Sequence, residues 1–442
     1  MIMRRFFTLL SFLLVMSSLW AYDVKVGELY YNFTSDSTVE LTHEVYMSPT
    51  NYAGLTEVVV PSEVMYDGKS YAVTMLSNMA FMYASSLKSV DISEGVSGIG
   101  AFAFAGCASL TSINFPKSIN SVGVDAFANV PWYDNQPDGV VYVNDYLYKY
   151  KGTMPANTTI KVKDGVTSIG AAAFAGCSSL VGIELPNSLL YIQYQAFAGC
   201  SSLTEVLIPE NVEWLDEDAF AFCSSLTSVV IPKRTLYINL GAFRSCSSLD
   251  SIVVKEGNPV YDSREHCNAI IETTTNRLLV GCKSTVIPKS VTGIAYVAFY
   301  GCTGLSTIVI PKGVTLIEEG VFYGCTGLTS VVCHAETPPI VEAHTFDAEM
   351  YKGILSVPCS ALDVYKADVY WGKFATIQCF EEDNTDLREG MVLGVRVNTG
   401  RVECEVPYTI YDMSGRDVTA QNGNLQGVYV VRTVKGVTKV VM

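Results

Sequence analysis

Cysteine is the residue type with the greatest chemical potential in this sequence of 442 residues. Of its 13 cysteines, seven share one setting, three residues after a phenylalanine and three residues before a leucine. A thiolate can act as a nucleophile or bind a metal ion. A thiol repeated at one position of a regular pattern is more consistent with packing, because buried cysteine behaves as a small apolar residue. We therefore expect these seven cysteines inside the fold: Cys107, Cys177, Cys200, Cys223, Cys246, Cys302 and Cys325.

Other cysteines lie outside this setting. Cys359 with Cys379, or Cys267 with Cys282, could form a disulfide. A disulfide requires a specific geometry that sequence spacing does not fix, so both pairings stay open.

Histidines and paired carboxylates show no catalytic pattern. The segment Cys333-His334, followed by His344, lacks a recognised zinc spacing. Acidic residues cluster at 216–218 and 318–319, where the chain is expected to turn into solvent. A calcium site or a glycosidase pair would need further carboxylates from elsewhere in the fold. The sequence therefore predicts no metal, no other cofactor and no enzymatic activity.

A period of 23 residues positions these side chains. The segments AFAGCSSL, AFAGCSSL, AFAFCSSL and AFRSCSSL recur at that interval. From Leu203 to Cys223 the unit reads Leu-x-x-Val-x-Ile-Pro-x-x-Val-x-x-Leu-x-x-x-Ala-Phe-x-x-Cys. The phenylalanine of the unit recurs nine times, as Phe81, Phe104, Phe127, Phe174, Phe197, Phe220, Phe243, Phe299 and Phe322.

Each unit predicts one coil of a solenoid. Its Leu-x-x-Val-x-Ile part alternates as a half-buried strand does, and the following proline ends the strand. Its Ala-Phe-x-x-Cys part has the spacing of a helical turn. One coil cannot bury its own apolar face, so stacking of coils must create the core. The predicted fold class is a β-rich repeat solenoid with one short strand and one helical turn per coil, β-rich caps at both ends and a small C-terminal β unit.

The unit resembles a known family. Its proline after the strand and its Ala-Phe-x-x-Cys-x-x-Leu block are similar to the BspA-like bacterial leucine-rich repeats, over roughly residues 22–380. The resemblance implies a surface-exposed binding protein, since some members of that family are adhesins for host matrix proteins. The C-terminal segments Ile410-Tyr-Asp, Gly415-Arg416 and Gly427-Val-Tyr resemble, over a short stretch, the sorting domains of type IX secretion in Bacteroidetes.

The 23-residue interval is broken twice. Phe127 and Phe174 are 47 residues apart, and Phe243 and Phe299 are 56 residues apart. We interpret the extra segments as insertions near 131–160 and 255–285, each carrying a strand pair that projects from its coil. Such insertions are either part of a binding face or tolerated surface hairpins.

Composition changes at the two ends suggest further parts of the chain. Residues 1–21 have the basic start, the apolar run and the small residue Ala21 of a secretory signal peptide. Residues 22–75 are expected to form a β-rich cap, 76–346 the solenoid and 347–380 a closing cap. Residues 381–400 are expected to be a linker and 401–442 a β tail that serves in sorting or anchoring, or is a plain appendage.

Charge and hydropathy limit the partners. The net charge is −15, and no basic run follows the predicted signal peptide, so nucleic acid is not expected as a partner. No later segment is apolar enough to span a membrane, so we expect a protein that is secreted or held at the cell surface.

The predicted ligand-binding surface follows from the strand alternation. Val206 and Ile208 are expected to point inward, so Leu207 points outward. The same outward row contains Asn114, Glu184, Leu207, Val230, Val253, Val309 and Val332. Its apolar members are either a cross-strand packing row or a ligand-facing patch. With the tyrosines of the first insertion, they give the candidate site Leu207, Val230, Val253, Val309, Val332, Tyr142, Tyr146 and Tyr148.

The sequence thus favours a cell-surface recognition protein or adhesin whose ligand is an extracellular protein or a polysaccharide. The alternative is a structural or assembly protein of the cell envelope. Self-association through the apolar row in the absence of a ligand would indicate the alternative.

Overall fold

The computed structural model describes residues 21–46, 52–342 and 344–381, together with 395–398, 401–404, 408–412, 418–422, 428–433 and 436–441. These residues belong to two units. The first comprises Met1–Ser306, Gly313–Leu328 and Pro339–Met350, and the second comprises Thr307–Lys312, Thr329–Pro338 and Tyr351–Met442. The predicted signal peptide, apart from Ala21, and residues 382–394 of the predicted linker lie outside the described residues.

The first unit is a solenoid whose coils carry the predicted strand on one side, which we call the long-strand wall. Its strands pair in parallel within three groups. The alternation of buried and exposed residues, for example in the pattern eBeB of β18, confirms the predicted half-buried strands. The groups are β4 (Glu57–Val60), β7 (Ser89–Ile92) and β9 (Ser112–Asn114), then β13 (Thr158–Lys161) and β15 (Leu180–Glu184), then β18 (Ser228–Ile231) and β20 (Ser251–Val254). Since β4 already belongs to this wall, the first coil begins inside the range assigned to the cap from sequence.

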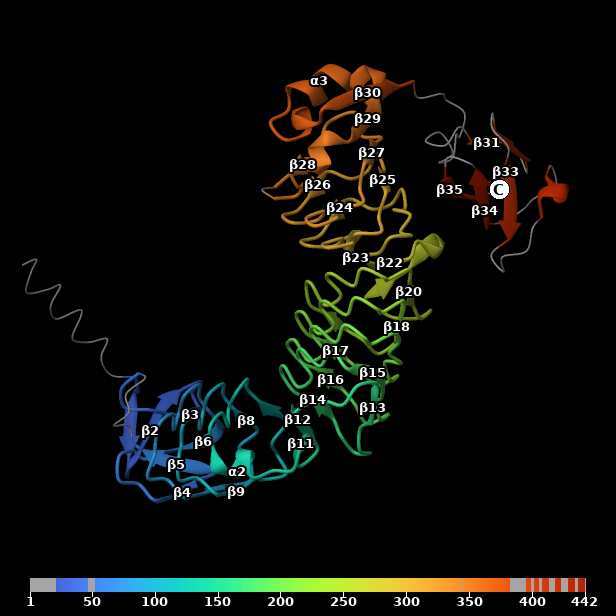
Figure 1. Cartoon of the computed structure of the whole chain (residues 1–442). Coiled ribbons are helices and arrows are strands. Elements are labelled where there is room, and N and C mark those ends of the chain that lie inside the picture. Colours follow the sequence, from blue (N-terminus) through green and yellow to red (C-terminus); the bar gives the residue numbers. More distant parts are fainter. Residues whose placement is uncertain are drawn as a thin grey trace, which may run out of the picture. The chain divides into compact units, whose positions relative to one another are not determined.

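Further short strands, which belong to three separate sheets and which we call the short-strand wall, run along another side of the same coils (Figure 1). The sequence predicted one strand per coil, but the Leu of each Val-x-x-Leu segment lies in a further parallel strand of two residues. Two residues are too few to show alternation, which is why the sequence pattern did not indicate it. The strands are β8 (Gly98–Ile99), β10 (Ser121–Val122), β14 (Ser168–Ile169), β16 (Tyr191–Ile192), β17 (Trp214–Leu215), β19 (Tyr237–Ile238), β24 (Gly293–Ile294), β26 (Leu316–Ile317) and β28 (Ile340–Val341).

The Ala-Phe-x-x-Cys part of each coil is a series of turns instead of the predicted helical turn. Backbone N–H groups alternate there between two kinds of acceptor. The N–H of Phe197 donates to Ala219 in the next coil at 2.8 Å, whereas the N–H of Ala198 donates to Gln195 three residues back at 3.0 Å. Gln195 has a φ of 53°, which rules out a continuous helix. These turns therefore join neighbouring coils through backbone hydrogen bonds, as the strands of the two walls do.

Phenylalanines and cysteines form the interior. The rings of Phe174, Phe197, Phe220 and Phe243 stack with centroids 5.3, 5.0 and 5.4 Å apart. The thiol of Cys223 donates to the carbonyl of Phe197 in the preceding coil at 3.2 Å. Six of the seven repeat cysteines are buried and Cys177 is half-buried, so the predicted structural role is confirmed by position.

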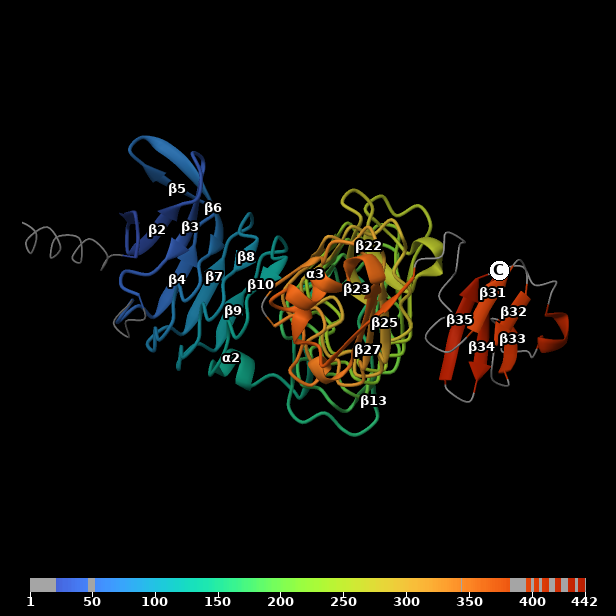
Figure 2. The ribbon, with the colours of Figure 1, turned by 90° about the horizontal axis from the view of Figure 1, so that it is seen from above.

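The N-terminal part of the first unit is β-rich. Strands β1 (Val24–Val26), β2 (Leu29–Phe33) and β3 (Thr38–Thr42) are antiparallel. Strand β3 then pairs in parallel with β6 (Lys69–Leu76), which also pairs with β5 (Glu63–Tyr66). Strand β6 also pairs in parallel with β8, the first strand of the short-strand wall. The N-terminal sheet and the start of that wall are therefore one continuous sheet, as Figure 2 shows.

The two insertions do not project as predicted. Strands β11 (Gly139–Val143) and β12 (Tyr146–Lys151) form a hairpin, and so do β22 (Ala269–Glu272) and β23 (Arg277–Gly281). However, β12 pairs in parallel with β14, and β23 pairs in parallel with β24. Each hairpin thus supplies the strand that its coil needs on the short-strand wall. The predicted strand pairs are therefore present, but the prediction that they project from their coils was wrong, because insertion length does not reveal which residues become buried. Short elements accompany the hairpins: α2 (Pro131–Asp134), β21 (Tyr261–Asp262) and η1 (Arg264–His266).

The second unit contains the last parallel strands and a β-rich tail. Strands β25 (Thr307–Ile310), β27 (Ser330–Cys333), β29 (Ile354–Pro358) and β30 (Thr376–Phe380) pair in parallel. Helix α3 (Leu362–Ala367) connects β29 to β30 in the sequence and packs against both strands. Short 3₁₀ turns are η2 (Met350–Lys352), η3 (Cys359–Ala361) and η4 (Trp371–Lys373). The tail holds β31 (Val395–Asn398), β32 (Arg401–Cys404), β33 (Tyr408–Asp412), η6 (Thr419–Gln421), β34 (Val428–Thr433) and β35 (Gly436–Val441), with antiparallel strand pairs.

Of the two disulfides left open by the sequence, the structure contains the one between Cys359 and Cys379. Cys267 and Cys282 are both free and buried. Strands β29 and β30 bring the first pair together, since Val357 lies opposite Cys379 in the sheet.

Candidate functional site

The predicted apolar row is exposed in the first unit. Leu207 is 78% exposed, Val253 44% and Val230 37%. Val230 and Val253 lie opposite each other in the pairing of β18 with β20, and a bridge from Glu205 to Ser228 aligns the preceding coil with β18. We call Leu207, Val230 and Val253 the apolar stripe.

In the second unit the same repeat position is more enclosed. Val309 of β25 is half-buried, and Val332 of β27 is buried with 9% of its surface exposed. Val332 is flanked by strands on both sides, since it lies opposite Val309 and Ser356. The prediction that Val332 faces a ligand was wrong, and Val309 contributes only part of its surface.

The tyrosines of the first insertion are mostly interior. Tyr146 and Tyr148 are buried, because β12 takes the place of a coil strand and turns these rings into the core. Their proposed contact with a ligand is therefore excluded in the folded chain. Tyr142 remains half-buried: its hydroxyl accepts a hydrogen bond from the N–H of Lys163, whose ammonium lies 4.7 Å from the ring centroid. Burial raises the pKa of Tyr142.

The buried cysteines of the repeat are held in the protonated form. Burial raises the pKa of Cys107, Cys223 and Cys302 to about 12. A thiol must ionise to act as a nucleophile or metal ligand, so these thiols are unreactive at neutral pH. Among the described residues, no three His, Cys, Asp or Glu side chains are grouped so that they could hold a metal ion.

One carboxylate of each acidic cluster noted in the sequence is engaged in an ion pair. Asp218 is buried, and the Nη2 of Arg244 donates to its carboxylate at 2.6 Å while Nε donates to the other oxygen. This hydrogen bond raises the pKa of the Arg244 guanidinium. Glu318 pairs with Arg277 from the second hairpin. These carboxylates connect neighbouring segments of the solenoid.

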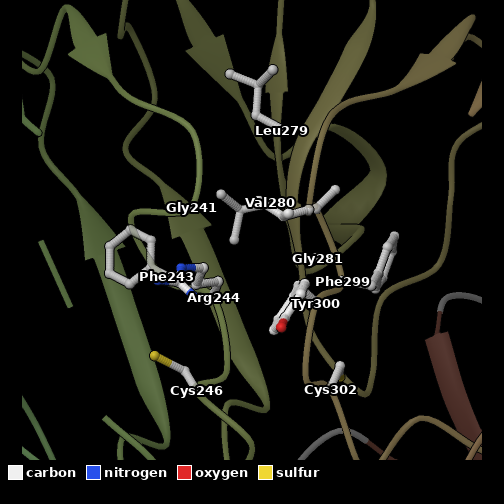
Figure 3. A pocket seen from close by; sticks show the side chains of 12 residues that line it. Gly241, Phe243, Arg244, Cys246, Leu279, Val280, Gly281, Phe299, Tyr300 and Cys302 are labelled. Atoms are coloured by element: carbon white, nitrogen blue, oxygen red, sulfur yellow. The ribbon is translucent and has the colours of Figure 1, made fainter. Parts of the chain in front are cut away.

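A small pocket lies where the second insertion interrupts the stack of phenylalanine rings (Figure 3). Phe243 and Arg244 line one side, and Phe299 and Tyr300 line the other. The guanidinium carbon of Arg244 lies 4.6 Å from the ring centroid of Phe222 and 5.7 Å from that of Tyr300. Arg244 is already paired with Asp218, and the pocket offers mainly aromatic and aliphatic contacts.

Sequence reasoning missed a second exposed row. Tyr191, Trp214 and Tyr237 occupy one position in three successive strands of the short-strand wall. Their 23-residue spacing was visible in the sequence. The wall itself was not predicted, so nothing indicated that these three side chains point outward together.

The repeat geometry agrees with a family match. A profile described as the BspA type leucine rich repeat region matches six copies, within residues 74–150, 142–267 and 277–352, which is more than half of the chain. The chain belongs to the BspA-type leucine-rich-repeat family. The resemblance inferred from the Pro and Ala-Phe-x-x-Cys positions is thereby confirmed, and the type IX sorting tail stays a prediction.

Solved structures similar to this BspA-type protein come from several bacteria. A leucine-rich cell surface protein from Faecalibacterium prausnitzii is 19% identical, with coverage of 82% of this chain and 95% of that one and a TM-score of 0.36. A leucine-rich repeat protein from Bacteroides ovatus is 22% identical, with coverages of 81% and 100% and a TM-score of 0.31. The pneumococcal vaccine antigen PcpA is 14% identical, with coverages of 81% and 98% and a TM-score of 0.31. No curated protein matches the chain.

Within the described part of the chain, no helix has the length and apolar character needed to cross a bilayer.

Proposed function

We propose that this BspA-type protein is an exported recognition protein that binds an extracellular protein through the apolar stripe. The observation that carries the proposal is the exposure of Leu207, 78% of whose surface is open to solvent in a segment that a backbone bridge at Glu205 aligns with β18. Val230 and Val253 extend the apolar surface across the next two coils. Exposed apolar residues that adjoin one another commonly mark interaction sites.

Export is supported by two features of the chain. Residues 1–21 have the pattern of a secretory signal peptide. The disulfide between Cys359 and Cys379 fits an oxidising compartment, since disulfides persist outside the cytosol. We further propose that the β tail, from residue 401 to residue 442, has a sorting or anchoring role at the cell surface.

The stripe is better suited to a protein than to a polysaccharide. Its members are aliphatic, and such side chains gain binding energy mainly by burial against other apolar groups. Glu205 flanks Leu207 in the preceding outward position, so a polar rim adjoins the stripe. An apolar centre with a polar rim is typical of protein interfaces.

The test measures binding of the full chain, without residues 1–21, to immobilised extracellular-matrix proteins, mucin and polysaccharides. The triple variant Leu207→Ser/Val230→Ser/Val253→Ser should lose at least about tenfold in affinity, because interface centres concentrate the binding energy. A matched pair compares Leu207→Ser with Val59→Ser, an exposed valine of β4 whose neighbour in register is Asp91. Only the former should weaken binding.

Unchanged affinity of the folded triple variant would exclude the stripe as the binding site. Light scattering of the same proteins without ligand measures their oligomeric state and so tests the alternative, a structural or assembly protein. Oligomers formed by the wild type and lost in the triple variant would favour a structural protein whose stripe contacts a second copy.

A further inference from the structure

The short-strand wall carries aromatic side chains in three consecutive coils. Tyr191, Trp214 and Tyr237 lie opposite one another in the pairing of β16, β17 and β19. Tyr191 is 36% exposed and Tyr237 is 52% exposed, and Trp214 is half-buried. At the same position, the neighbouring strand β14 has Ser168, which is buried. The rings therefore form a bounded surface, which we call the aromatic row.

The rings have a fixed orientation. Trp214 and Tyr237 stack with centroids 4.4 Å apart and an angle of 27° between their planes. A stacked pair retains two outer faces and its ring edges for other contacts. Because the rings are already ordered, little side-chain entropy remains to be lost on binding.

A second row of polar groups runs beside the aromatic row, two residues further along each strand. It consists of Gln193, Asp216 and Asn239. The amide of Asn239 donates to Asp216 Oδ1 at 2.6 Å, and the Tyr146 hydroxyl lies 2.7 Å from Gln193 Oε1. Among the described residues, no hydrogen bond uses Asp216 Oδ2 or the side-chain oxygen of Asn239. The polar row is thus held in place with acceptors to spare.

We propose that the aromatic row and the polar row together bind a neutral polysaccharide. The negative faces of aromatic rings attract the weakly positive C–H groups of a pyranose ring. Carboxylate and amide groups can accept and donate hydrogen bonds to sugar hydroxyls. Rings and polar groups recur in these three consecutive coils at a strand spacing of about 4.8 Å, comparable to the length of one sugar unit, so the surface matches a polymer with a regular repeat. A protein ligand has no such periodicity.

Charge selects against acidic polymers. Glu213 precedes Trp214 and Glu217 follows Asp216, so carboxylates border both rows. The nearby cation Arg234 is paired with Glu213, with 3.6 Å between nitrogen and oxygen. Uronate-rich or sulfated glycans would meet like charges here, whereas a neutral glycan would not. This site lies on a different wall from the apolar stripe and shares with the proposed function only its extracellular setting.

The experiment titrates the full chain, without residues 1–21, with mixed-linkage β-glucan, xylan, galactomannan and amylopectin, and with polygalacturonate as an anionic comparison. Saturable binding of at least one neutral glycan is expected. The variant Tyr191→Ser/Tyr237→Ser should bind that glycan about tenfold more weakly. The control is Tyr83→Ser/Tyr323→Ser, which removes two tyrosines of similar exposure from the turns of other coils and should bind as the wild type does.

Fluorescence gives a second reading that does not depend on the stability of the double variant. The glycan should shift the tryptophan emission of the wild type, and Trp214→Phe should keep binding but lose the shift. Equal affinity of the two tyrosine variants, binding of polygalacturonate alone, or no binding of any neutral glycan would overturn the proposal. The stripe variant Leu207→Ser/Val230→Ser/Val253→Ser should bind the glycan normally, so failure of either site is distinguishable from failure of the other.

Discussion

The regular coils and the two hairpin coils solve one packing problem in different ways. In the regular coils, the interior rings of Phe174 to Phe243 stack nearly in parallel at 5.0 to 5.4 Å. At the first hairpin, Tyr148 packs edge-on against Phe127 at 5.2 Å, and Tyr150 contacts Phe174 at 6.3 Å. The hairpin tyrosines thus bridge the interrupted stack. A coil can be replaced when its substitute fills the same interior and supplies the same backbone hydrogen bonds.

The second hairpin joins its neighbouring coils in another way. The backbone N–H of Ser245 donates to Tyr300 at 2.8 Å, joining the coils on either side of the insertion. The guanidinium of Arg244 contacts the rings of both Phe222 and Tyr300. A cation–aromatic contact therefore continues the packing where two phenylalanines do not meet.

The largest effect is expected in a regular coil. Phe220→Ala should lower the free energy of unfolding by about 3–5 kcal/mol, because it removes a fully buried ring that stacks on both sides. Urea unfolding followed by circular dichroism would measure it. The control is Phe222→Ala, whose ring is 46% exposed and should cost less than about 1 kcal/mol. Equal losses of unfolding free energy in the two variants would show that the buried ring stack does not stabilise the fold more than an exposed ring does.

A smaller effect is expected where a hairpin joins its neighbours. Tyr146→Phe should cost about 1–3 kcal/mol, because the hydroxyl donates to the carbonyl of Val122 at 2.8 Å and that buried acceptor would lose its partner. The ring itself is retained, so packing changes little. Urea unfolding is again the measurement, with Tyr142→Phe as a control at a half-buried site of the same hairpin. A loss no larger than that of the control would mean that the hydroxyl does not stabilise the junction.

The smallest effect concerns the cysteines, and it depends on pH. Burial raises the pKa of Cys223 from 9.0 to about 12, so the folded chain keeps this proton while the unfolded chain loses it above pH 9. Stability should be constant below pH 8 and decrease between pH 9 and 12, by at most about 1.4 kcal/mol per pH unit for each such thiol. Unfolding free energies from pH 7 to 10.5 should therefore decline less steeply in Cys223→Ala.

Hairpin cysteines provide the comparison for this slope. Burial raises the pKa of Cys267 to about 11. The decrease in stability caused by this thiol should therefore stop at a lower pH than the decrease caused by Cys223. An identical slope in the wild type and in Cys223→Ala would contradict the assignment of a protonated thiol to the interior of the regular coils.

Sequence alone determined the features that repeat. Identical coils create identical surroundings every 23 residues. Phe197 and Phe220 therefore share one interior position, and Cys200 and Cys223 share another. The same reasoning placed Leu207 on the outside of the long-strand wall, where the structure has it. A local pattern suffices in these cases because burial is decided by the neighbouring copy of the same pattern.

Only the tertiary structure decided the features that occur once. The sequence of the first insertion gave no sign that β12 would pair with β14, and that pairing buries Tyr146 and Tyr148. The choice of Cys359 with Cys379 over Cys267 with Cys282 depends on strand pairing in the closing cap. Such outcomes are set by contacts between segments that carry no shared pattern, so the physical reason for them appears only when those segments are placed in space.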